Sequence, residues 1–244
     1  MSIQEFSNNF DTMLNSYANK MPFGEDASKV NLAFDEYEKS VFLTDAQNEL
    51  VIGLYTGRNL FGNSFETTEE IRRYLANLVC DATLFPVPSQ TTHIDRYKEN
   101  AFFNLPTQPK VWYIIYESVV VDKGEGRCGG EQSLAVTPVR HDEWHRIKKN
   151  PFRGINGRKA LRLDVGNGQV EIASDYPIVE YYLRYLRGVK PIVLESLTDT
   201  ELDIEGQKEA SEACELPESI HYVLLEMAGE KALRSRGINK ETNK

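Results

Sequence analysis

The spacing of apolar residues divides the chain into helical ends and a strand-rich middle. Up to about residue 80, apolar side chains recur at intervals of about three to four residues, which is typical of helices that bury one face. Three of the predicted helices begin at pairs resembling capping boxes, in which each residue satisfies the other's backbone N–H. The pairs are Ser2 with Glu5, Thr44 with Gln47 and Thr67 with Glu70; these helices are expected to reach Ala18, Gly57 and Val79, and a short helix is expected around Phe34 and Tyr37.

Runs of β-branched and aromatic residues predict strands in the middle of the chain. They cover residues 111–121 and 133–139, a hairpin at 161–173, and residues 179–186. The last segment also fits helical spacing, but its aromatic content and the Gly-x-Lys-Pro that follows favour a strand.

The hairpin has the most specific local signal, because Asn167-Gly168 suits a type I′ turn with positive φ at both central residues. A two-residue loop there predicts that Val165 faces Val170 and that Leu163 faces Ile172, with all four side chains on one buried face. The same register sets Asp164 opposite Glu171. Like charges in that position are unfavourable, so a basic group is expected nearby, from Arg162, Lys159 or a partner.

Helical spacing returns near the C-terminus, where Pro217 suits a first helical position and Gly237 suits the end of a helix. A terminal helix with a full apolar stripe must bury it, and the N-terminal helices are the natural place. We therefore predict an α+β fold in which the N-terminal helices and the C-terminal helix form a bundle, with an antiparallel β-rich domain inserted. The expected domains are residues 1–88 with 205–244, and residues 89–204, which include an acidic linker.

Composition is that of an ordinary globular protein, with 41% hydrophobic and 27% charged residues in 244. No apolar run approaches the ~18 residues of a membrane span, and the N-terminus lacks the apolar core of a secretory signal. The cysteines, Cys80, Cys128 and Cys214, are odd in number and widely spaced, which favours a reducing compartment and argues against structural zinc.

The net charge of −9 is unevenly distributed. Residues 195–218, the acidic segment, hold nine carboxylates against Lys208, and Glu201, Asp203 and Glu205 are its candidate interaction residues. Residues 140–162, the basic segment, suit contact with nucleic acid or with complementary copies. Its eight candidate residues are Arg140, Arg146, Lys148, Lys149, Arg153, Arg158, Lys159 and Arg162.

Two motifs resemble chemical sites but lack the required context. Residues 124–129 match GxGxxG, yet they connect two predicted strands and no helix follows to receive a pyrophosphate. His141 and His145 have the spacing of two metal ligands on a helix, but Asp142 stands where the zincin motif needs Glu, and no third ligand is evident. We therefore predict no catalytic, cofactor-binding or metal-binding residues, and no enzymatic activity.

Three stretches together resemble a known protein family: HDEWHRIKKNPFRGINGRKALRLDV, EYYLRYLRGVKPIVL and CELPESIHYVLLEMAGEKAL. They resemble the ring, or head-to-tail connector, proteins of short-tailed, crAss-like bacteriophages. The resemblance implies a structural virion protein that forms a ring, commonly twelvefold, beneath the portal and around the DNA exit channel. It implies copies of the chain, the portal protein and other tail or ring proteins as partners, with DNA in passing and no membrane. It also implies assembly in the host cytoplasm and a place at the head–tail interface of the virion.

Two alternatives remain open from the residues. One is a soluble nucleic-acid-associated factor that uses the basic segment, although a pI near 5.1 weighs against it. The other is an enzyme with a metal at His141 and His145.

Overall fold

The computed structural model describes residues 1–20, 33–59, 62–88, 99–124, 130–147, 150–211 and 213–237. The chain divides into two compact units. Unit 1 comprises residues 1–78 and 189–244, and unit 2 comprises residues 79–188. Each unit is described by itself.

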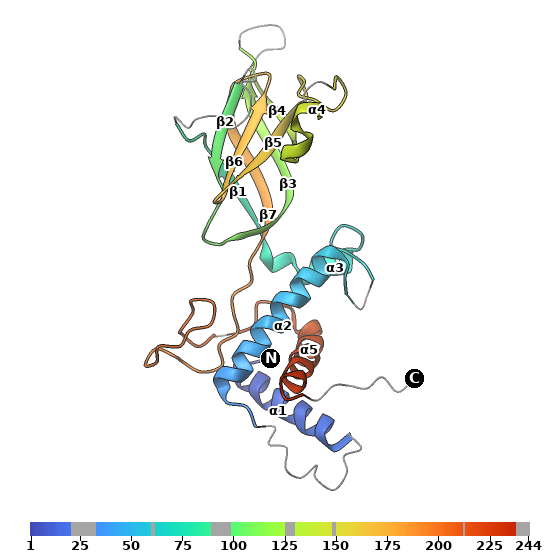
Figure 1. Cartoon of the computed structure of the whole chain (residues 1–244), viewed down its shortest axis with the longest axis vertical. Helices are drawn as coiled ribbons and strands as arrows, with labels where there is room; N and C mark the ends of the chain where they lie inside the picture. Colours follow the sequence, from blue (N-terminus) through green and yellow to red (C-terminus); the bar gives the residue numbers. More distant parts are fainter. Residues whose placement is uncertain are drawn as a thin grey trace. The chain divides into compact units, whose positions relative to one another are not determined.

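Unit 2 is a seven-stranded sheet in the order β1-β7-β3-β4-β5-β6-β2. The sheet is mixed, because β4 and β5 run parallel while every other neighbouring pair is antiparallel. It is strongly curled, so that edge strand β2 approaches β7 and the rings of Phe103 and Tyr181 lie 5.2 Å apart (Figure 1). The strands are β1 (Val79–Leu84), β2 (Glu99–Asn104), β3 (Val111–Asp122), β4 (Glu131–Pro138), β5 (Lys159–Gly166), β6 (Gln169–Ser174) and β7 (Ile178–Arg187).

Alternation along these strands separates two apolar clusters. The larger cluster fills the inside of the curl, where Val119, Leu134, Ile172 and Tyr181 are buried. The smaller cluster lies on the other face of β5 and β6 and includes Leu161, Leu163 and Ala173 under Trp144 and Ile155.

Unit 1 contains three long helices, α1 (Ile3–Lys20), α2 (Glu36–Thr56) and α5 (His221–Ser235), together with the short helix α3 (Glu69–Tyr74). Helix α5 packs against both α2 and α1 (Figure 1). Its buried residues, among them Leu224 and Ala228, share this core with Phe6, Phe10 and Leu50.

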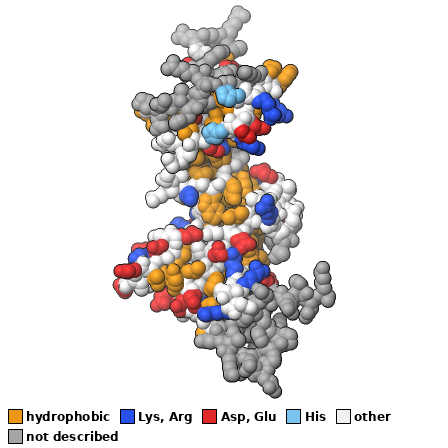
Figure 2. Space-filling view, viewed as in Figure 1, with side chains coloured by type: hydrophobic (Ala, Val, Ile, Leu, Met, Phe, Trp, Pro, Cys, Tyr) orange, Lys and Arg blue, Asp and Glu red, His pale blue; other side chains and the backbone are white. Residues whose placement is uncertain are grey.

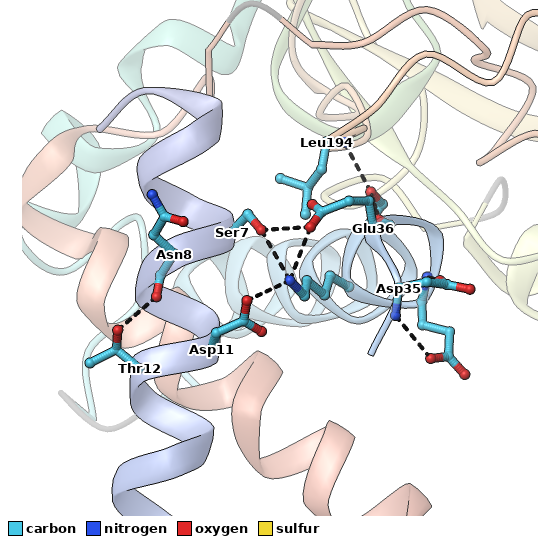
Figure 3. Close-up of polar contacts among 10 residues, drawn as sticks. Ser7, Asn8, Asp11, Thr12, Asp35, Glu36 and Leu194 are labelled. Atoms are coloured by element: carbon cyan, nitrogen blue, oxygen red, sulfur yellow. Dashed lines mark hydrogen bonds and ion pairs between the residues drawn. The ribbon is translucent and has the colours of Figure 1, made fainter. Parts of the chain in front are cut away.

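A buried lysine joins α1 to α2. Lys39 is 4% exposed, and its ammonium group donates to Asp11 at 2.7 Å, to Glu36 at 3.0 Å and to Ser7 at 3.1 Å. Figure 3 shows these three acceptors gathered between the two helices. Burial opposes the charge, but the hydrogen bonds to Asp11 and Glu36 outweigh it and raise the pKa of Lys39, so the lysine stays protonated.

One face of α2 is polar because it binds an extended segment rather than another helix. The Ser40 hydroxyl accepts from the Leu194 N–H at 2.9 Å, the Thr44 hydroxyl accepts from the Ile192 N–H at 3.0 Å, and the Gln47 amide donates to the Lys190 carbonyl at 3.2 Å. These side chains are buried, and they form hydrogen bonds with backbone groups of residues 190–194 that would otherwise be buried without a partner.

The predicted fold class is wrong. The chain is β-rich, its dominant element is the curled, mixed sheet, and its few helices do not make a bundle that carries an inserted antiparallel domain. The predicted third helix is only six residues long, and Val79, which was assigned to it, begins strand β1. Backbone pairing of β1 with β7 overrides the helical spacing there. The predicted domain boundaries stay a prediction.

Several predicted elements are confirmed. The strands at 111–121, 133–139 and 179–186 correspond to β3, β4 and β7, and helices occupy both predicted ends of the chain. Ser2 and Glu5 form the expected capping box, with hydrogen bonds of 2.7 and 3.3 Å, and Gly57 ends α2 at a φ of 82°.

The start predicted for the second helix is wrong. Helix α2 begins at Glu36, where Asp35 and Glu38 form the capping box, and it runs through Thr44 without a break. Thr44 and Gln47 therefore act as buried partners of residues 190–194 instead of capping a helix.

The hairpin turn is confirmed but its register is wrong. Asn167 and Gly168 have φ of 52° and 73°, as a type I′ turn requires, yet Gly166 adopts a φ of 101° and the strand has a bulge between Asp164 and Gly166. The bulge shifts the pairing by one residue, so that Asp164 lies opposite Val170, and Glu171 lies opposite Leu163. Asp164 and Glu171 are not opposite each other, and Leu163 faces the opposite side of the sheet from Ile172.

His221 gives unit 1 a predictable response to pH. The ring is 2% exposed, its Nε2 donates to the Leu216 carbonyl at 2.7 Å, and its buried Nδ1 has no hydrogen-bond partner among the described residues. Burial lowers the pKa of His221, so the folded state binds this proton less readily than the unfolded state does. The contribution of His221 to the free energy of unfolding is therefore fully present above the ordinary histidine pKa of about 6.5. This contribution falls as the pH drops below that value, by at most about 1.4 kcal/mol per pH unit.

We expect the free energy of unfolding, followed by the helical circular dichroism signal, to decrease between pH 7 and pH 5.5. His221→Gln should flatten this dependence. Equal slopes in the parent and in His221→Gln would contradict the assignment.

Candidate interaction surfaces

Most of the basic segment lies in the connection from β4 to β5 in unit 2. These strands run parallel, so the chain must cross over to return to the same end of the sheet. The crossover carries a 3-10 turn (His141–Glu143) and helix α4 (Trp144–Ile147). Trp144, 4% exposed, and Ile155, 9% exposed, pack onto Leu161 and Leu163, and this anchors the crossover to the sheet.

Two of the predicted basic residues are paired within the crossover itself. Arg140 contacts Asp142 at 2.8 Å and Arg146 contacts Glu143 at 2.9 Å, and all four side chains are at least a third exposed. Exposed pairs of this kind contribute roughly 0–1 kcal/mol. Their main effect is to offset the positive charge of Arg140 and Arg146 locally.

The tip of the crossover is an ordered turn that projects an aromatic ring. The Asn150 side-chain oxygen accepts from the N–H groups of Phe152 at 2.9 Å and Arg153 at 3.1 Å, and the Asn150 carbonyl accepts from the Gly154 N–H at 2.7 Å. Phe152 is 89% exposed. Lys159 donates to the Arg153 carbonyl at 3.0 Å, and no described carboxylate forms an ion pair with Arg153. We call residues 150–154 the Phe152 turn.

Arg158 is also exposed, whereas Lys148 and Lys149 lie outside the described residues. Arg162 is only 7% exposed and lies inside the curl of the sheet. Its Nη1 donates to Glu117 at 2.7 Å, and the Tyr181 hydroxyl donates to the same carboxylate oxygen at 2.7 Å. Arg162 is therefore buried and is not part of the exposed basic surface.

The buried network on Glu117 fixes the protonation of its partners. Burial, and next the Glu117 carboxylate, raise the pKa of Tyr181 far above its usual range, so the phenol remains a donor. Burial opposes the charge on Arg162, but the Glu117 carboxylate outweighs it and raises the pKa of the guanidinium. The sequence signal for this site was Glu117 in the mainly β-branched and aromatic run of β3, and it was missed.

The acidic segment lies in unit 1, and residues 197–208 form its acidic loop. Glu201, Asp203 and Glu205 are exposed there, and Figure 2 shows carboxylates gathered over the loop that Figure 1 draws beside α2. Leu197 and Ile204 bury their side chains with Val193 beneath the loop. Leu197 donates to the Lys208 carbonyl at 2.7 Å and closes the base of the loop.

Two of the loop's candidate residues also hold its shape. Glu205 accepts from the Asn48 amide on α2 at 2.7 Å, and Asp203 accepts from the Gly206 N–H at 2.9 Å. Glu205 and Gly206 have φ of 50° and 82°, a tight turn that points the neighbouring carboxylates outward. The structure thus places the described basic candidates in unit 2 and the acidic candidates in unit 1.

The remaining motifs do not gather into a site within the described ranges. His141 bonds to the Asp164 carbonyl at 2.7 Å, and no described group of three or more His, Cys, Asp and Glu side chains could hold a metal ion. The GxGxxG residues join antiparallel strands β3 and β4, and positions 125–129 lie outside the described residues. No described helix has both the length and the apolar character needed to cross a membrane.

Comparison with known proteins decides the family. The model of the phage tail ring protein 3/4 family matches residues 1–244, the whole chain. The chain belongs to this family.

Two relatives come from Bacteroides phage crAss001. Its ring protein 3 is 39% identical over 237 residues, which cover 97% of this chain and 96% of the relative. Its ring protein 4/5 is 26% identical over 241 residues, covering 95% and 92%. The chain is thus a structural ring protein of the virion of a crAss-like phage, and the family resemblance noted in the sequence is confirmed.

The buried network of this ring protein is open to a stability test. Glu117→Leu should leave the buried Arg162 charge with only the exposed Asp164 carboxylate, at 3.2 Å, to offset it, and should cost about 3–5 kcal/mol. Arg162→Met should cost a similar amount. The double change removes both charges together, so it should cost less than either single change.

Both tryptophans, Trp112 and Trp144, lie in unit 2, so their fluorescence during urea unfolding reports on this unit. The matched control is Arg184→Met at the exposed pair with Asp81, which should cost roughly 0–1 kcal/mol. Additive costs of the two single changes would show that Glu117 and Arg162 do not stabilise each other.

Proposed function

We propose that this ring protein belongs to the head-to-tail connector, where copies of the chain form a ring next to the portal and DNA passes through the channel. The partners are copies of the chain, commonly twelve in such rings, with the portal protein and other tail or ring proteins. Assembly takes place in the host cytoplasm. The likeness to a phage protein named ring protein 3 supports a ring, and the segregation of charge between the two units supports the way in which copies join.

The observation that carries the proposal is the presence of two unlike, ordered surfaces on one chain. A ring built from head-to-tail contacts needs two different complementary patches on each subunit. The exposed Arg153 and Arg158 of unit 2 supply a basic patch, and the acidic loop of unit 1 supplies an acidic one. The contact between the two patches of neighbouring copies would set register and speed encounter, while apolar contacts supply most of the affinity.

The same details weigh against a dedicated nucleic-acid-binding factor. Such a factor needs several unpaired cations on one surface. Arg140 and Arg146 are paired with neighbouring carboxylates, and Arg162 is buried against Glu117. The basic surface is therefore smaller than the eight residues of the sequence suggest.

The place in the virion is tested by electron cryo-microscopy of whole particles. We expect density for this chain in a closed ring directly beside the portal, with the channel continuous through both. Density for the chain at the far end of the tail would overturn the connector assignment, and density outside any ring would overturn the ring.

The electrostatic contact is tested by charge reversal. Arg153→Glu with Arg158→Glu should slow ring assembly about tenfold at low salt, and this difference should shrink as salt screens the charges. Assembly is followed by the appearance of particles many times heavier than the 27.8 kDa chain, with circular dichroism as the control for folding.

The matched control is Lys110→Glu, at an exposed lysine of unit 2 outside the basic segment. It should assemble at the parental rate. If the double variant also folds and assembles like the parent at low salt, the basic segment takes no part in subunit contacts.

A further inference from the structure

The Phe152 turn has the form of a docking knob. Its aromatic ring is 89% exposed, although the three backbone hydrogen bonds to Asn150 hold the turn in one shape. Burying a phenylalanine removes about 150–250 Å² of surface from water. The ring of Phe152 is exposed in the single chain, so its burial against a partner would stabilise the complex. Large aromatic residues in such positions are typical of the few side chains that dominate interface affinity.

Unit 1 contains a groove between α2 and α5 with a volume of about 440 Å³. Leu50, Val223 and Met227 form its apolar lining, together with Gly53. A side chain at Gly53 would come within 2.9 Å of the Arg58 carbonyl, so glycine is what lets the following loop close one end of the groove. The volume is in the range of about 300–1,000 Å³ that is usual for sites enclosing an organic group.

The rim of the groove is acidic. Glu49, Glu226 and Glu230 lie around it together with Arg58. Lys231 contacts Glu49 at 2.7 Å but also contacts Asp45, and Arg234 lies 3.7 Å from Glu230, so the carboxylates at the rim still outnumber the cations beside them. Glu49 is one residue from Asn48, which binds Glu205 of the acidic loop, so the groove and the acidic loop share helix α2.

We propose that the Phe152 turn of one copy inserts into the α2–α5 groove of a neighbouring copy. The inference rests on the proposed ring, and it names the apolar contact that would hold the ring together. The Phe152 ring occupies the apolar lining, and Arg153 lies against the glutamate rim. Each copy carries one turn and one groove, so the contact is head to tail and each copy offers a free groove to the next.

Charge selects this knob among the exposed aromatic residues. Phe85 is 66% exposed in the same unit, but its neighbours Leu84, Pro86 and Val87 carry no charge that matches an acidic rim. Tyr222, 67% exposed, lies on α5 itself, in the same helix as the groove. Tyr116, 53% exposed in unit 2, lies opposite Arg184, but that arginine is paired with Asp81 at 2.9 Å. Among the exposed aromatic residues that the structure describes, Phe152 is thus the one beside an exposed arginine that forms no ion pair with a described carboxylate.

The test is a disulfide between copies of the full chain. In a background with Cys80, Cys128 and Cys214 changed to serine, Phe152→Cys with Met227→Cys should give, on mild oxidation, a ladder of dimers, trimers and larger species on a non-reducing gel. A mixture of the two single variants should give dimers and stop there, because each copy then has only one reactive cysteine. The matched control, Phe85→Cys with Met227→Cys, should give at least about tenfold less cross-linked product at the same cysteine exposure.

Each outcome decides the contact. A monomer that migrates faster after oxidation would show that the turn reaches the groove of its own chain, and it would overturn the proposal. Equal cross-linking in the Phe152 and Phe85 variants would also overturn it. Rings of normal mass that give no ladder refute this contact but leave the proposed function intact. A ladder from copies that form no ring supports the contact and counts against the ring.

A charge exchange gives an independent measurement. Arg153→Glu should reduce the yield of the ladder, and Glu226→Arg added to the same chain should restore at least part of it. Loss without any recovery would show that Arg153 acts elsewhere than on this rim.

Discussion

The parallel pairing of β4 and β5 is the constraint from which the surface of unit 2 follows. Antiparallel neighbours are joined by a short turn, but parallel neighbours require a chain segment that crosses back over the sheet. In unit 2 this crossover contains most of the basic segment, and Trp144 and Ile155 anchor it to the outer face of β5. Because both ends and the middle of the crossover are held, its tip at Phe152 and Arg153 presents a defined shape to solvent.

Charge is used in two different ways inside the two units. In unit 2, Glu117 accepts from both Arg162 and Tyr181, so an ion pair and a phenol fill part of the interior of the curled sheet. In unit 1, Lys39 joins α1 to α2 through three acceptors. Buried ion pairs contribute little net stability compared with apolar residues of the same size, but losing one partner is costly, so both networks penalise alternative packings.

Local chemistry was predictable from the sequence, and long-range pairing was not. The turn at Asn167-Gly168 depends only on which residues tolerate positive φ, and it was found. The hairpin register depends on a bulge beside Gly166, which places Arg162 and Ile172 on one face of the sheet and Leu163 on the other. The alternation of apolar and polar residues in this segment does not predict that bulge. Val79 fits a helical stripe in sequence but pairs with Leu186, more than a hundred residues away. Such pairings made the predicted fold class wrong. The predicted basic surface was partly wrong for the same reason. Arg162 was assigned to it because the sequence does not show that Arg162 pairs with Glu117 in another strand.

In the proposed contact between knob and groove, the charged and the apolar groups of the crossover have different effects, and both are required. Charge alone acts over about 8–10 Å in physiological salt and is tolerant of position, so a basic patch meeting an acidic one would allow many registers. An aromatic ring seated in a groove allows one position but adds little to the rate of encounter. In the proposed contact, Arg153 and the glutamate rim bring neighbouring copies together in roughly the right orientation, and Phe152 then fixes a single register. A closed ring requires that same register at every contact around it, because an error at one interface would displace the last copy from the first.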